Sequence, residues 1–149
     1  MILPLRLRLA RRDQGRAIVE FLVVGLLLLV PVVYFVVTLS RVQAAAFAVS
    51  TASREAGRAF TTAPDEEAAY ARGLAAARVS FEDFDFGTDG GVALRCDGSP
   101  CLRPEGRVEA VATVNVRLPL VPDLLSGAIP AVLPVSATHV ATVDRFRGR

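Results

Sequence analysis

Seventeen consecutive residues, from Phe21 to Val37, are all apolar or Gly, Pro or Tyr, and this run limits what this chain can fold into. With its flanks, the apolar segment extends from Ala17 to Leu39 and measures roughly 34 Å as an α-helix. That length crosses a hydrocarbon core of about 30 Å. The apolar part of a cleaved secretory signal is shorter, about 7 to 15 residues. We therefore expect a transmembrane helix over residues 16–40, with signal-peptidase cleavage near Ala46 as an alternative.

The charges of the 149-residue chain are distributed unevenly. Residues 1–16 hold five arginines against Asp13, whereas residues 17–149 hold twelve arginines against fourteen acids. Because basic flanks stay in the cytoplasm, we expect a cytoplasmic N-terminus and an extracytoplasmic domain over residues 41–149. The basic charge belongs to the N-terminal segment, so the pI of about 8.9 does not indicate nucleic-acid binding.

Two cysteines agree with export. Cys96 and Cys101 lie in CDGSPC, whose four central residues are common in turns. The spacing suits a small disulfide-closed loop, which loop entropy stabilises by roughly 2 kcal/mol, and disulfides are typical of exported domains. A metal site is the weaker alternative, since the two thiols are accompanied only by the distant His139. The spacing also differs from the C-x-x-C of redox enzymes.

The carboxylate of Glu20 stands at the start of the apolar segment, and it has two interpretations. At the cytoplasmic interface a carboxylate costs little and needs no role. Alternatively, cleavage after Gly15 makes Arg16 the first residue, with Glu20 about 6 Å along the helix from the new α-amine. Since opposite charges attract strongly in a low dielectric, the amine of one subunit would pair with Glu20 of a neighbour.

Three stretches together resemble the TadE-like family of minor pilins or pseudopilins from tight-adherence (Flp) pilus systems. They are GRAIVEF at 15–21, LLLLV at 26–30 and ASREAGRAF at 52–60, and the resemblance covers about residues 11–60. It implies a leader over residues 1–15 of the type IV prepilin kind, cut between Gly15 and Arg16 by a membrane-embedded prepilin peptidase. Arg16 departs from the small or apolar residue that is usual there. The implied partners are that peptidase, other pilin-like subunits, the pilus assembly machinery and the lipid bilayer.

The exported part reads as an α+β domain. Apolar residues at helical spacing extend the first helix beyond the membrane segment, over residues 41–60. Pro31 should kink the helix within the membrane segment. This stripe contains Val42, Ala45, Ala46, Val49, Ala52, Ala56 and Phe60. Its small residues suit packing either on a neighbouring subunit or on the chain's own sheet.

Further along, Pro64 and the acids after it favour a second helix over 64–80. The region 92–145 is β-rich, with expected strands at 92–96, 107–118 and 134–145 forming a small antiparallel sheet. Between these regions, Phe81, Phe84 and Phe86 should anchor a loop or edge strand on the core, with the acids facing water. A calcium site is an alternative interpretation of the acidic loop 82–89, although the loop lacks the order of ligand residues found in an EF-hand.

The chemistry of the sequence favours a structural role. No nucleophile with a matched base and no phosphate-cradling loop is recognisable, so we expect neither enzyme activity nor a cofactor. The resemblance implies a minor pilin or pseudopilin in pilus assembly or a related secretion apparatus. The alternative is an uncleaved single-pass membrane anchor that displays an extracytoplasmic binding domain.

Overall fold

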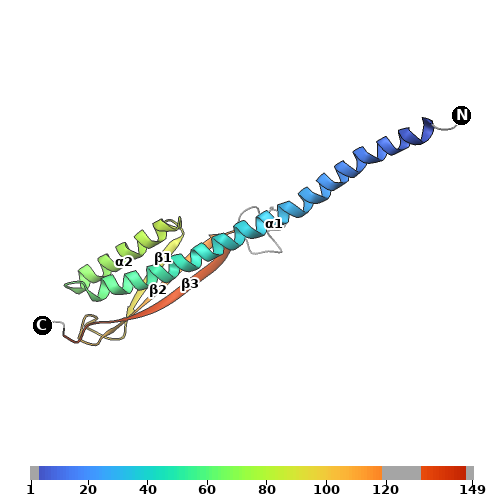
Figure 1. Ribbon diagram of the computed structural model, residues 1–149. Helices are drawn as coiled ribbons and strands as arrows, with labels where there is room; N and C mark the ends of the chain where they lie inside the picture. Colours follow the sequence, from blue (N-terminus) through green and yellow to red (C-terminus); the bar gives the residue numbers. More distant parts are fainter. Residues whose placement is uncertain (1–3, 119–131, 147–149) are drawn as a thin grey trace. The chain divides into compact units, whose positions relative to one another are not determined.

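The computed structural model describes the backbone of residues 4–118 and 132–146, and the side chains of these residues from Ala17 onward (Figure 1). The chain falls into two compact units, Met1–Thr38 and Leu39–Arg149. The elements are α1 (Pro4–Thr61), α2 (Glu66–Asp83), β1 (Gly90–Cys96), β2 (Arg107–Arg117) and β3 (Val132–Thr142). A long N-terminal apolar helix, a second helix and a three-stranded antiparallel sheet confirm the predicted α+β class.

Within the first unit, α1 is one uninterrupted helix that includes Pro31. From Ala17 to Val33 every side chain is exposed, and Tyr34 and Thr38 are half-buried. This stretch is the N-terminal part of the helix Ala17–Thr61, which is long and apolar enough to cross a membrane. None of the most apolar window of that helix is buried in the chain. An exposed apolar surface of this size needs a surrounding other than water.

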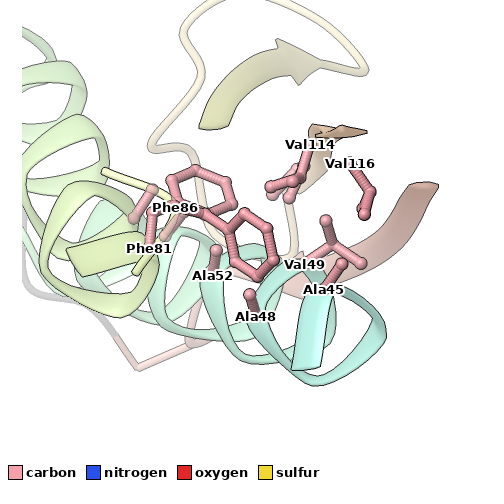
Figure 2. Close-up of a cluster of buried hydrophobic side chains, with 12 residues drawn as sticks. Ala45, Ala48, Val49, Ala52, Phe81, Phe86, Val114 and Val116 are labelled. Atoms are coloured by element: carbon pink, nitrogen blue, oxygen red, sulfur yellow. The ribbon is translucent and has the colours of Figure 1, made fainter. Parts of the chain in front are cut away.

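In the second unit, the small side chains of α1 form the centre of the core. Ala45, Ala48, Ala52 and Ala56 are fully buried and Val49 almost so, and Figure 2 shows this helix face against Phe81, Phe86, Val114 and Val116. The predicted stripe therefore packs on the chain's own sheet and second helix. Ala46 is wrong as a member of it: it is exposed, because it lies about 100° around the helix from Ala45.

Helix α2 begins and ends later than predicted. Asp65 has an extended backbone and its carboxylate accepts a 2.8 Å hydrogen bond from the N–H of Ala68, so it caps the helix at a residue where the sequence placed its first turn. At the other end the helix continues through Phe81, which is buried in the core, as is Phe86 in the following turn. The predicted anchoring on the core is confirmed, but the residues that provide it lie in a helix and a turn rather than in a loop or edge strand.

The sheet has the order β1-β2-β3, with both pairings antiparallel. Its inner face carries small apolar pairs such as Val108 with Ala141 and Ala112 with Ala137. Gly57 of α1 closely approaches Ala141, and Gly73 of α2 approaches Leu94 of β1, so both helices lie on this inner face. The second unit is therefore a two-layer arrangement of helices on a sheet.

Strand β3 starts at Val132, before the predicted residue 134, and ends at Thr142 rather than 145. Pro134 lies inside it, opposite Asn115 of β2. A proline lacks the N–H that a central strand must donate, but an edge strand tolerates it. The position of β3 at the edge of the sheet therefore accommodates Pro134 within the strand.

Adjacent glycines at the start of β1 allow a matched test of the core. A Cβ added at Gly90 would lie 2.4 Å from Cγ of the buried Phe81 ring, whereas one added at Gly91 would meet nothing within 4 Å. We expect Gly90→Ala to lower the free energy of unfolding by about 1–3 kcal/mol through overpacking. Gly91→Ala should leave it unchanged or slightly higher. Thermal unfolding of the detergent-solubilised chain checks this, and equal effects of the two substitutions would contradict the packing.

Candidate functional site

The segment predicted to be processed lies within α1. Gly15, Arg16 and Glu20 all have helical backbones, and the Glu20 side chain is exposed. No ion pair joins its carboxylate to another side chain that the structure describes. The neighbouring Phe21 is 77% exposed. Among the described side chains, Glu20 is therefore an exposed carboxylate beside apolar residues, without an ion-pair partner. The roles of Gly15 and Arg16 in cleavage stay predictions.

The two cysteines form the predicted disulfide. Cys96 at the end of β1 is bonded to Cys101, with the two Cα atoms 5.4 Å apart. The backbone N–H of Cys101 donates a hydrogen bond to the Glu66 carboxylate in the first turn of α2. The hydroxyl of Tyr70 lies 3.9 Å from both sulfur atoms, and its ring meets Phe60 of α1 edge-on. The disulfide loop is thus tied to both helices, which is a structural role.

Asp97 organises the same loop from within. Its carboxylate accepts hydrogen bonds from the backbone N–H of Arg107 at 3.0 Å and from the guanidinium of Arg103 at 2.9 Å. The Arg107 N–H, and to a lesser extent the charge of Arg103, hold the pKa of Asp97 below its ordinary value of 3.8. Sequence reasoning identified Asp97 only as a turn residue, since its partners lie six and ten positions further along the chain.

The acidic segment 82–89 forms ion pairs with three separate arginines. Glu82 pairs with Arg78 on the same helix, Asp85 with Arg41, and Asp89 with Arg117. Within the described ranges, no three His, Cys, Asp or Glu side chains come together as a possible metal site. Neither the calcium alternative nor the metal site at the two thiols is supported by a group of ligands among these described residues.

His139 lies on the inner face of the sheet, opposite Ala110 in the register and half-buried beneath α1 at Gly57. The buried hydroxyls of Ser53 and Ser80 donate to carbonyl groups of their own helices. These three side chains serve packing and helix geometry in the arrangement seen here. None is joined to another as a nucleophile and base.

The described part of the second unit has open surface depressions. Two adjacent ones flank Asp144 and Phe146. A third is lined by Arg41, Asp85, Phe86, Asp89, Asn115, Val116 and Arg117. No local sequence signal identifies this third site, because its charged residues come from three separate regions of the chain.

Comparison with protein-family models, with curated proteins and with solved structures yielded no match to this chain.

The lowered pKa of Asp97 predicts a pH-dependent stability. A carboxylate whose pKa is lower in the folded state stabilises it fully above the unfolded value, and this contribution is lost as the pH falls through the folded value. Asp97→Asn should lower Tm at neutral pH, and its difference from wild type should shrink below about pH 4. Unfolding scans across this range measure the effect. The exposed Asp83→Asn is the control, and a constant difference between Asp97→Asn and wild type would contradict the assignment.

Proposed function

We propose that this chain is a TadE-like minor pilin or pseudopilin that acts structurally in pilus assembly or a related secretion apparatus. A prepilin peptidase cuts it between Gly15 and Arg16, and α1 then holds it in the cell membrane with the second unit outside the cytoplasm. The observation that carries the proposal is Glu20, which stands exposed on an apolar helix and has no partner among the described side chains.

The apolar part of α1 supports membrane insertion. Exposed side chains such as Leu27 at 72% and Phe35 at 65% cover this helix on all sides. Burying each large apolar side chain contributes about 1.5–3 kcal/mol. The exposed band is therefore a strong driving force for entry into lipid, and later for packing among the helices of neighbouring subunits.

Cleavage would give Glu20 a partner. A new α-amine has a pKa of about 8 and is charged at neutral pH. At about 5 Å and an effective dielectric of about 20, an ammonium and a carboxylate attract by about 3 kcal/mol. An isolated carboxylate in an apolar environment is unfavourable, so a subunit that pairs its amine with Glu20 of a neighbour removes two unpaired charges at once. Assembly in the membrane is favoured for that reason.

The second unit fits a displayed domain. It has its own core and a disulfide, which suits an oxidising compartment. Its packing also argues against release by signal peptidase after Ala46. Such a cut would separate Ala45 from Ala48 and Val49, although all three are buried in the same core.

The mass of the cellular protein tests the cleavage. In cells with an active prepilin peptidase, we expect the chain to begin at Arg16, fifteen residues shorter than the full sequence. Gly15→Val should block cutting, because the peptidase must hold the segment extended and close, and a side chain obstructs this approach. Intact-mass and N-terminal analysis measure both. A chain that begins at Met1 in such cells would support the uncleaved anchor instead.

Glu20→Ala tests the assembly step. Without the carboxylate, the amine of a neighbour stays unpaired, and an attraction of about 3 kcal/mol corresponds to roughly a hundredfold weaker association. We expect Glu20→Ala to reduce incorporation into pilus complexes strongly, as measured by co-purification with other subunits. The control Glu67→Ala removes an exposed carboxylate of α2 and should have no effect. Normal processing together with normal incorporation of Glu20→Ala would refute the pairing.

A further inference from the structure

The third surface depression belongs to an end of the second unit that combines charge with exposed aliphatic side chains. We call this end the Arg41 rim, and define it by Arg41, Asp85, Asp89, Arg117, Val132 and Leu133. Arg41 and Arg117 have 49% and 79% of their side chains exposed. Val132 pairs with Arg117 in the sheet and is 43% exposed, and the adjacent Leu133 is 38% exposed.

Arg41 lies close to the apolar segment in the sequence. Arg41 follows Leu39, the last residue of the apolar segment, by two positions, which is about 3 Å of helix. Where the segment crosses a bilayer, the Arg41 guanidinium reaches the layer of lipid headgroups. Arg117 and both aspartates line one depression with Arg41, so they lie near that layer as well.

The ion pairs of the rim are weak enough for its charged groups to exchange these partners for groups of a ligand. Arg41 and Asp85 are 3.7 Å apart, as are Arg117 and Asp89, and the Asp85 side chain is 91% exposed. Exposed pairs of this kind contribute only about 0–1 kcal/mol. A guanidinium binds a phosphate through two parallel hydrogen bonds, which are stronger. Each aspartate, in turn, can accept a hydrogen bond from an ammonium group.

The charges therefore match a zwitterionic headgroup rather than an anionic surface. Two arginines and two aspartates provide equal numbers of positive and negative groups around one depression. A phospholipid such as phosphatidylethanolamine presents one phosphate and one ammonium, which complement this arrangement. The exposed Asp85 and the nearby Glu82 and Asp83 would be repelled by a strongly negative membrane.

The aliphatic residues point to the same occupant. Val132 lies opposite Arg117 in the sheet and Leu133 follows it, and such combinations of arginine with exposed apolar groups are typical of membrane interfaces.

We propose that the Arg41 rim binds zwitterionic phospholipid headgroups and holds the second unit on the extracytoplasmic surface of the membrane that α1 crosses. The arginines hold lipid phosphate, the aspartates hold lipid ammonium, and Val132 and Leu133 enter the interfacial layer. The proposal rests on the membrane anchoring that forms part of the proposed function. It adds a defined contact between the displayed domain and lipid.

Tryptophan fluorescence of the full chain tests this contact, because the native sequence contains no tryptophan. Single variants Val132→Trp, Val140→Trp and Leu28→Trp are reconstituted in phosphatidylcholine and phosphatidylethanolamine vesicles whose acyl chains carry bromine near the headgroup. Val140 is an exposed residue of the same strand, about 26 Å further along it. Leu28 is in the apolar segment. Circular dichroism verifies that each variant is folded.

Bromine quenches tryptophan on contact, and interfacial side chains enter lipid by about 5–10 Å, so Val132→Trp should lose about twofold more emission than Val140→Trp. Leu28→Trp should be quenched strongly. Equal emission from the Val132 and Val140 variants, with Leu28→Trp quenched, would overturn the rim contact and leave the anchor intact. An unquenched Leu28→Trp would overturn the membrane anchor and the rim contact with it.

Charge substitutions in the Val132→Trp background test the headgroup recognition. Arg41→Gln with Arg117→Gln should bring the quenching down towards the Val140→Trp level. The control pair, Arg54→Gln with Arg95→Gln, removes two exposed arginines elsewhere and should leave the quenching unchanged. Unchanged quenching in the rim variant would overturn the role of the arginines. Quenching that appears only when phosphatidylglycerol is added would overturn recognition of zwitterionic lipid.

Discussion

The close approach of α1 to the sheet, made through alanine and glycine, is the contact on which the second unit depends. Alanine faces alanine across this interface, as Ala52 and Ala56 of the helix lie in one core cluster with Ala110 and Ala112 of β2. Small side chains bring the two backbones near each other, but each buries little area, so the core gains little from any one of them. The few large groups, such as Phe81, and the disulfide therefore carry an unusual share of the stability.

The sequence was sufficient to predict an element where the local residue pattern agrees with the environment of that element. The uncharged run from Phe21 predicted the apolar helix, and alternating Val and Ala residues predicted β2, because both patterns are dictated by the medium that each face meets. The disulfide followed from the turn chemistry of CDGSPC. Boundaries were less accurate, since α2 starts after its cap Asp65 and β3 starts at Val132, two residues before Pro134.

Contacts between distant parts of the chain were beyond sequence reasoning. Gly73 meets Leu94 and the carbonyl of Ala56, and Asp85 pairs with Arg41 across more than forty positions. No periodicity or spacing identifies such partners, because they depend on how the elements pack. The candidate site divides in the same way. Glu20 was recognisable from one unexpected carboxylate, whereas the Arg41 rim exists only once three separate segments are brought together.

The charged residues at the two ends of the apolar segment differ in their ion pairing, and this difference affects where subunits would associate. At the Leu39 end, Arg41 has Asp85 as a partner within its own chain. At the other end, Glu20 has no partner among the described side chains. Under the proposed function, an unpaired charge at an apolar boundary favours association with an opposite charge of a neighbouring subunit. Under the proposed function, recognition between subunits is therefore concentrated at the Glu20 end, while the Arg41 end needs only the lipid headgroups beside it.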